Sequence, residues 1–217
     1  MTASKNPIFV ASLFLCTLLL AFQVRAEEAP DVLVKRITEE VMDAVRRDKA
    51  IKAGDRERIH ALVESKIVPH VDLERATALA VGRHWRNASP EQREQLIKEF
   101  RALLLYTYAG GLSQIRDQKL EFKPLRIDPA GTEAEVRFEV RQNRRAEPLQ
   151  VSYRLYKAPD GWKVYDVNVL GVWLGQTYRS SFAAEIERSG IEGLIRTLAE
   201  KNRVLAAQAG DTARTEN

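Results

Sequence analysis

The feature that most constrains the fold of this 217-residue chain is a change in the spacing of its apolar residues. Up to Tyr108 they recur three and four positions apart, which is the period of an amphipathic helix. From Leu120 to Leu155 they alternate with polar residues, which is the period of a half-buried strand. Helices followed by consecutive strands predict an α+β fold with an antiparallel sheet.

The helices of the first half have clear start and stop signals. Ser89, Pro90 and Gln92 provide an N-cap hydroxyl, a proline at the first helical position and a side chain that reaches back to the cap. The second half of that helix is apolar on more than one face, so we expect it to be covered on several sides. Helices are predicted from Asp31, after Asp55 up to Pro69, from Asp72 to about Arg86, and from Ser89 to at least Tyr108.

Four strands follow, and their order predicts an antiparallel meander. The turn sequence Ala158–Gly161 joins the last two as a hairpin. In the last strand the apolar residues change faces after Val164, which a bulge or helices on both faces would explain. The apolar positions of the strands are Leu120 and Phe122, then Val136, Phe138 and Val140, then Leu149, Val151, Tyr153 and Leu155, then residues from Trp162 to Val169.

The last strand leads directly into an apolar turn and a helix. Large apolar side chains therefore gather where the sheet meets helices, and such a junction is a pocket candidate. Two helices are predicted after Trp173, separated at Gly190, and the polar, small-residue segment 206–217 is predicted to be disordered.

The first residues have the pattern of a secretory signal. Lys5 precedes an apolar run from Ile8 to Phe22, and Val24-Arg25-Ala26 places small residues where a signal peptidase cleaves. We therefore expect residues 1–26 to be removed, leaving a single domain at 27–205. The alternative is a membrane anchor, but the run is short for a bilayer span and lacks a basic stop sequence.

Removal of this segment would change both the cysteine content and the charge. It takes away Cys16, the single cysteine, so no disulfide is expected; Leu13–Leu15 are too bulky for lipidation of that residue. It also takes away Lys5 and Arg25 from 34 basic residues set against 30 acidic ones, which leaves a net charge of +2. No basic footprint for nucleic acid is present in the sequence.

The sequence predicts no catalytic, metal or cofactor site. His60, His70 and His84 do not share a helix face, and nucleophile, phosphate-loop and dinucleotide motifs are absent. Asp166, within an apolar strand, is the one candidate acid or base. The competing interpretation is that Asp166 pairs with an arginine or caps a backbone group.

A filled core and a ligand cavity would contain the same apolar residue types, so composition leaves both open. The basic run Arg141–Arg145 is either a solvated hairpin tip or an anion-binding patch. The candidate lining of a pocket consists of Phe100, Leu103, Leu104, Tyr108, Phe138, Tyr153, Val167, Val169, Val172 and Trp173.

Several short segments, taken in their order along residues 31–201, resemble the MlaC (toluene-tolerance) family of periplasmic phospholipid-binding proteins. Each segment alone is a modest signal, whereas the order is distinctive. The segments are Ile67–Val71, Ala80–Trp85, Ser89–Glu94 leading to Phe100, Trp162–Val167 and Gly190–Leu194.

The resemblance implies a helical layer against a curved four-stranded sheet that encloses an apolar pocket for lipid tails. It also implies a non-enzymatic carrier that moves phospholipid through the periplasm and maintains outer-membrane lipid asymmetry. The implied partners are an outer-membrane lipoprotein complex and the MCE-domain subunit of an inner-membrane ABC transporter, and a monomer is expected. Two alternatives remain: an enzyme that acts on an apolar substrate through Asp166, and an adaptor whose groove binds a partner peptide.

Overall fold

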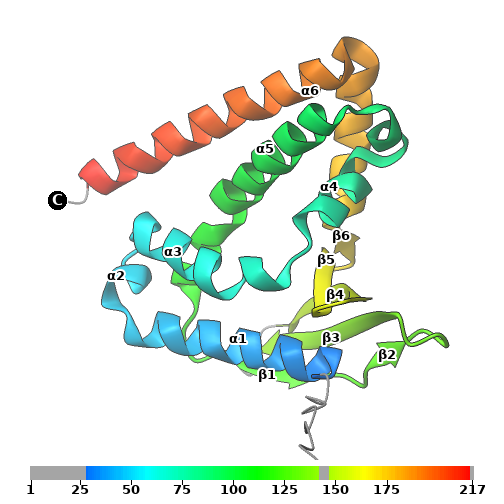
Figure 1. The fold of residues 1–217 in the computed structure, drawn as a ribbon. Coiled ribbons are helices and arrows are strands. Elements are labelled where there is room, and N and C mark those ends of the chain that lie inside the picture. The colour runs from blue at the N-terminus through cyan, green and yellow to red at the C-terminus, as the bar shows by residue number, and fades with distance from the viewer. Residues whose placement is uncertain (1–27, 142–146, 216–217) are drawn as a thin grey trace, which may run out of the picture.

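The computed structural model describes residues 28–141 and 147–215. The expected signal segment, 1–26, and most of the basic run Arg141–Arg145 lie outside these residues. Helices form one layer and an antiparallel sheet the other, with α1 lying along the sheet and α5 and α6 running side by side away from it (Figure 1). The α+β class predicted from the change of period is confirmed.

The helical elements begin and end close to their sequence signals. Ser89 N donates to Gln92 Oε1 at 2.9 Å and Gln92 N donates to Ser89 Oγ at 3.2 Å, which completes the predicted capping box. The helices are α1 (Pro30–Arg47), α2 (Lys49–Lys52), α3 (Arg56–Lys66), α4 (Leu73–Val81), α5 (Pro90–Tyr108) and α6 (Leu174–Thr215), with 3₁₀ turns η1 (Val68–His70), η2 (Gly82–Asn87) and η3 (Ala109–Gln114).

The sheet has six strands where the sequence predicts four. The four longer strands are the predicted meander, and the two that were missed contain two residues each, too few to show a period. Their order is β1-β3-β4-β5-β6, with β2 paired to β3, and every pairing is antiparallel. The strands are β1 (Lys119–Phe122), β2 (Arg126–Ile127), β3 (Glu133–Arg141), β4 (Leu149–Ala158), β5 (Gly161–Val169) and β6 (Val172–Trp173).

The predicted bulge lies in β5. Arg154 of β4 pairs with Asp166 and Leu155 pairs with Val164, so Tyr165 is an extra residue without a partner in this register. The extra residue restores the alternation of inward-facing and outward-facing side chains that the change of faces in the sequence had interrupted. Apolar residues on both sides of it, such as Val164 and Val167, consequently face the same side of the sheet.

Three clusters of buried apolar residues form the core. The helical cluster lies between α4, α5 and α6, the sheet cluster between α1 and the sheet, and the third cluster between α1, α2, α3 and η3. Leu103 is buried in the helical cluster, whereas Leu105 packs against the third cluster. The apolar end of α5 is therefore covered on several sides, as predicted.

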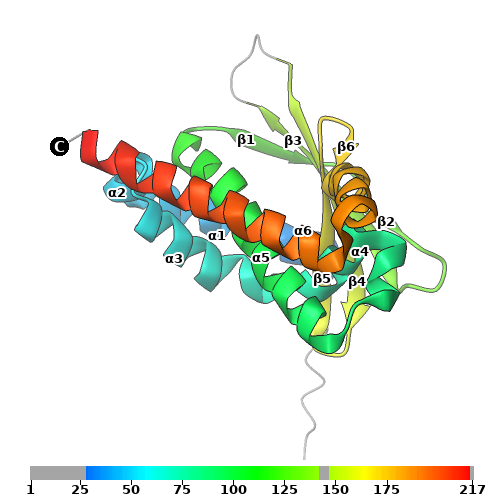
Figure 2. The same ribbon diagram turned by 90° about the horizontal axis from the view of Figure 1, so that it is seen from above.

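Helix α6 bends at Gly190, where the sequence predicts a break between two helices. Gly190 has φ 73° and ψ 178°, values outside the helical region. Glu185 Oε1 accepts hydrogen bonds from Ser189 Oγ at 2.5 Å and from Thr197 Oγ1 at 3.1 Å, so one carboxylate joins the two arms. Beyond the bend the helix extends past the end of α5 (Figure 2).

The disordered tail predicted from residue 206 is corrected, because α6 continues as a helix to Thr215. Small residues such as Ala206 and Ala207 are also good helix formers, so a polar, small-residue composition was a poor guide here. Within the described part of the chain, no helix is both long enough and apolar enough to cross a bilayer.

Gly193→Ala is expected to destabilise the bend. A Cβ at this position would clash with the Cβ and Oγ of Ser189, so the free energy of unfolding should fall by about 1–3 kcal/mol. Chemical denaturation measures the change. Gly110→Ala is the control, because a Cβ there meets nothing within 4 Å; equal losses for both variants would contradict this account of the bend.

Candidate functional site

The inner face of the sheet, the side on which α1 packs, carries a row of aromatic rings. Phe122 of β1 is the direct partner of Phe138 of β3, and their ring centroids are 5.1 Å apart. Tyr153 of β4 extends the row, with its centroid 5.7 Å from that of Phe138. Val167 of β5 lies opposite Tyr153. The row therefore crosses three strands and ends against a fourth.

Tyr153 is the chemically distinctive member of this row. Tyr153 is half-buried at the edge of the sheet cluster, and burial alone raises the pKa of its phenol. Among the described residues, its hydroxyl has no hydrogen-bond partner. The Tyr153 ring thus lies at the margin of the packed sheet cluster and keeps some accessible surface. That combination suits an apolar ligand.

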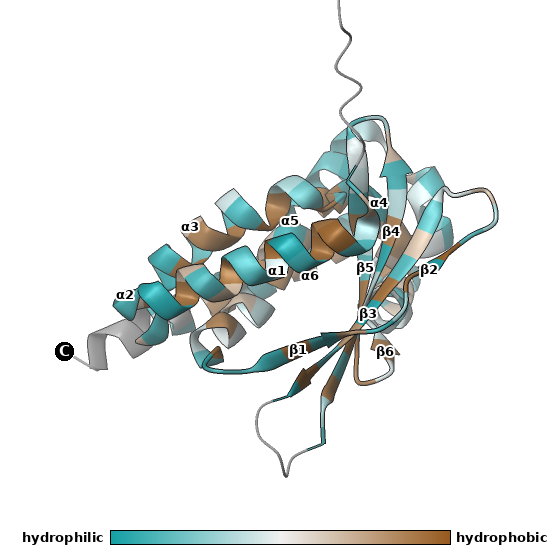
Figure 3. Ribbon diagram, turned by 90° about the horizontal axis from the view of Figure 1, so that it is seen from below, coloured by the Kyte–Doolittle hydropathy of each residue, from teal (hydrophilic) through white to brown (hydrophobic). Residues whose placement is uncertain are grey.

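The close backbone contacts of the helices leave the inner face unevenly covered. α1 crosses β3 on the inner face, whereas α4 and α6 meet β5 at the outer-face residues Tyr165 and Asp166, and the close contacts of α5 are to α4, α6 and η3. Figure 3 shows hydrophobic residues both on strands of the sheet and on the helices above it. The buried apolar residues consequently form separate clusters, and half-buried apolar residues lie at the margins of these clusters.

The structure brings only part of the predicted lining together. Phe138, Tyr153 and Val167 are neighbours on the inner face, and Val169 follows on the same face. Phe100 and Leu103 are buried in the helical cluster, and Leu104 packs at its edge. Phe122 was missed: its alternation with Leu120 indicated a strand, but only the pairing register places it beside Phe138.

The remaining predicted residues, Tyr108, Val172 and Trp173, lie in other environments. Tyr108 is exposed, and its hydroxyl is 3.2 Å from that of Tyr178, whose pKa is raised first by burial and then by this hydrogen bond. Val172 is exposed, whereas Trp173 is half-buried.

Two surface hollows in the described residues differ from the predicted pocket. The first is about 340 Å³ and lies along α1; it is lined by Val32, Lys35, Arg36, Glu39, Glu40 and Asp43. The second is about 290 Å³ and lies over the sheet; it is lined by Lys123, Pro124, Arg137, Phe138, Glu139, Gln150, Val151 and Ser152. Of the predicted lining residues only Phe138 contributes to either, so an enclosed lipid pocket stays a prediction.

Asp166 has a structural position on the outer face of the sheet. Its buried Oδ1 accepts hydrogen bonds from Gly175 N at 3.0 Å and Val167 N at 2.9 Å, and Arg154 Nη1 is 3.4 Å from its Oδ2. A carboxylate at the start of α6 also interacts favourably with the helix dipole. Gly175 permits this approach, because a Cβ there would lie 2.5 Å from Leu79 Cδ2.

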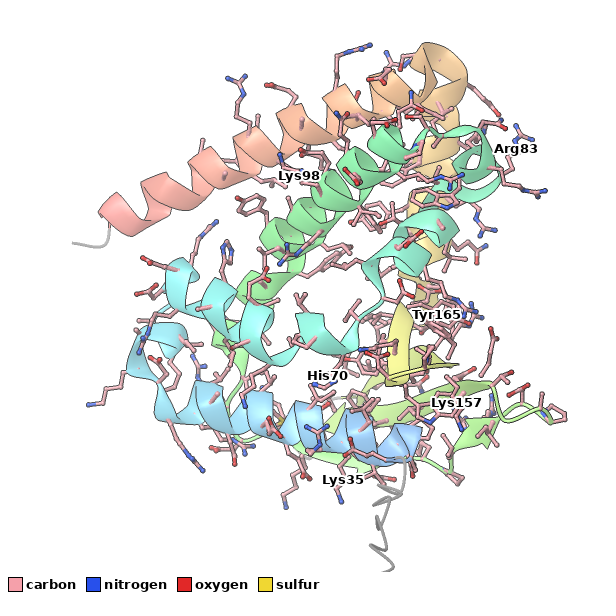
Figure 4. The ribbon with its side chains drawn as sticks, in the orientation of Figure 1. Lys35, His70, Arg83, Lys98, Lys157 and Tyr165 are labelled. Carbon is pink, nitrogen blue, oxygen red and sulfur yellow. The ribbon has the colours of Figure 1, made fainter. Side chains whose placement is uncertain are left out.

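Arginine–aromatic stacks cover other parts of the outer face. The Arg154 guanidinium lies 3.7 Å from the centroid of the Trp173 ring, and that of Arg75 lies 4.2 Å from the rings of both Tyr156 and Tyr165. Tyr165, labelled in Figure 4, lies where β5 meets α4. Sequence reasoning missed these stacks because no spacing rule links residues so far apart.

The β5–β6 hairpin has an unusual turn. Leu170 and Gly171 are its two central residues, with φ 53° and 86°. Positive φ at both positions defines a type I′ turn, which favours Asn, Asp or Gly at the first position. A leucine there costs about 1–3 kcal/mol of backbone strain.

Asp166→Ala is expected to lower the free energy of unfolding by about 1–3 kcal/mol, because the buried N–H of Gly175 loses its acceptor. Asp166→Asn keeps an acceptor oxygen and should lose less. Urea denaturation of the two variants beside the unmodified protein provides the measurement. An alanine variant as stable as the unmodified protein would remove the structural role assigned to this carboxylate.

Comparisons with known proteins agree on one family. The family model described as MlaC protein matches residues 35–200. The intermembrane phospholipid transport system binding protein MlaC of Haemophilus influenzae is 24% identical over 172 residues, covering 78% of this chain and 80% of that protein. The toluene tolerance protein ttg2D of Pseudomonas putida is 26% identical over 179 residues, covering 81% of this chain and 82% of the relative.

A solved structure adds a relative whose ligand is known. The phospholipid-binding protein from Ralstonia solanacearum, in complex with a phospholipid, matches with a TM-score of 0.75 and 40% identity, covering 81% of this chain and 98% of that one. The family match spans most of the described residues, and the fold agrees with it. The chain belongs to the MlaC family.

Proposed function

We propose that this protein binds phospholipid and carries it between membranes. The observation that carries the proposal is the match to the Ralstonia solanacearum protein, which was solved with a phospholipid bound and is covered almost completely by this chain. The aromatic row on the inner face supports it, because Phe122 and Tyr153 at its two ends are half-buried and leave apolar surface for acyl chains.

A carrier has a clear physical task. Exposing the two acyl chains of a phospholipid to water costs on the order of 25 kcal/mol, at about 0.8 kcal/mol for each of some 30 methylenes. A protein that covers these chains lowers the barrier to transfer. Inner-face residues such as Tyr153 and Val167 are the proposed acyl-chain contacts, and the other lining residues named from the sequence are proposed to contribute as the helices move apart around lipid.

The finer role is proposed from the family and from the names of the relatives. The protein, after removal of residues 1–26, would act as a single monomeric domain in the periplasm. It would exchange phospholipid between an outer-membrane lipoprotein complex and the MCE-domain subunit of an inner-membrane ABC transporter, and so maintain outer-membrane lipid asymmetry. A carrier alone equilibrates two pools, so direction must come from partners that distinguish its loaded and empty forms.

The environment of Asp166 favours a carrier over an enzyme. Its carboxylate is buried on the outer face, where backbone N–H groups and Arg154 occupy both oxygens. Tyr153, by contrast, lies on the inner face. The candidate acid or base and the candidate ligand surface are thus on opposite sides of the sheet, so the carboxylate is proposed to stabilise the fold.

Mass spectrometry of organic extracts tests the proposal, using protein purified from periplasm without detergent. The unmodified protein should contain nearly one phospholipid per chain. Val167→Trp should lose most of it, because the indole would fill the space beside Tyr153 while keeping the surface apolar.

Ile127→Trp is the matched control and should keep its lipid, because Ile127 is 51% exposed on β2 and does not belong to the proposed lining. Circular dichroism confirms that both variants are folded. Lipid-free unmodified protein would contradict the carrier function. Equal lipid content in both variants would contradict the inner-face site.

A further inference from the structure

The turn between β5 and β6 displays an unusual concentration of apolar surface. We call Val169, Leu170, Gly171 and Val172 the hairpin tip. Leu170 is 67% exposed, Val172 is 56% exposed, and Val169 is also exposed. Single exposed apolar residues are ordinary, but three around one two-residue turn form a contiguous patch.

Hydrogen bonds and strand pairing hold the hairpin tip in this conformation. The buried side chain of Asn168 accepts a hydrogen bond from Gly171 N at 2.9 Å, and Leu170 N donates to Gln150 O at 3.0 Å. Val169 and Val172 pair across the turn. Leu170 is strained at a position that suits Asn or Gly, and strain of this kind is maintained where it serves a function.

The segment that contains the hairpin tip is almost free of charged residues. Between Asp166 and Glu185 the only charged residue is Arg179, in a chain with 29% charged residues. Trp173 follows the tip directly, and the Arg154 guanidinium stacks on its ring. The order from the tip is apolar side chains, then an aromatic ring, then a cation. Groups follow the same order from the bilayer core outward at a membrane–water interface.

We propose that the hairpin tip inserts into the surface of a phospholipid bilayer. The hairpin projects from the edge of the sheet in two views (Figures 2 and 3), so its apolar residues form a convex tip that fluid lipid can surround. In this arrangement Trp173 lies at the level of the headgroups, and Arg154 lies beside their phosphates.

This inference rests on the proposed function and deepens it. A carrier must contact the bilayer that supplies or receives its lipid. Val169 and Val167 lie on the inner face of the same strand. Insertion of the tip would therefore bring the half-buried end of the aromatic row close to the membrane, where an acyl chain has the shortest path through water.

Vesicle flotation tests the contact. The mature protein is mixed with large unilamellar vesicles of phosphatidylethanolamine containing a minority of phosphatidylglycerol, and the bound fraction is measured at low and high salt. The unmodified protein should float with the vesicles and retain measurable binding at high salt, because the apolar contribution is not screened. Leu170→Asn should weaken binding about tenfold, since it removes a buried leucine from the membrane.

The same substitution should raise the thermal stability of the protein, because asparagine adopts positive φ more readily than leucine. Ile127→Asn is the control: Ile127 is 51% exposed on β2, and its replacement should leave flotation unchanged. An increase in stability together with a loss of binding would show that Leu170 is kept for contact with lipid and not for folding.

Three results would overturn the inference: unmodified protein that stays with the unbound fraction, Leu170→Asn that floats as well as unmodified protein, or equal losses for Leu170→Asn and Ile127→Asn. A tip that docks on a partner protein would give the first result. Mass spectrometry of lipid bound to Leu170→Asn separates the two proposals, because this variant should still contain phospholipid. Unmodified protein that contains phospholipid but does not float would reject the membrane contact and leave the carrier proposal in place.

Discussion

One extra residue in β5 determines how the two faces of the sheet are used. Because Tyr165 is inserted into the register, Val167 and Val169 join Val164 on the inner face, and Asp166 is turned to the outer face. Without that bulge the carboxylate of Asp166 would point toward the aromatic row. The bulge therefore provides an apolar inner face for the proposed ligand and an anchor for α6 on the opposite side.

The anchor in turn positions the long helix. Gly175 N donates to the Asp166 carboxylate, and the missing side chain of Gly175 lets the start of α6 approach Leu79 of α4. The bend at Gly190 then returns the second arm of α6 alongside α5. Buried apolar residues are consequently divided between separate clusters, which leaves Tyr153 only half-buried although its surroundings desolvate the phenol.

Most of the fold could be predicted from interactions between residues that are close in the sequence. The capping box at Ser89, the break at Gly190 and the bulge after Val164 each have a short-range cause, and all are present. Strands β2 and β6 were missed because two residues carry no period. The lining was harder to predict, because neighbours on α5 such as Leu103 and Leu105 pack into different clusters, and only tertiary packing decides which.

Photocrosslinking is the most direct test of the central claim that lipid lies against the inner face of the sheet. Benzoylphenylalanine would replace Tyr153 in one sample and Ile127, exposed on β2, in another, with each protein loaded with phospholipid and irradiated. The account predicts a covalent acyl-chain adduct at position 153 and none at position 127. Adducts at both positions or at neither, in protein shown to contain lipid, would contradict an acyl-chain site on this face.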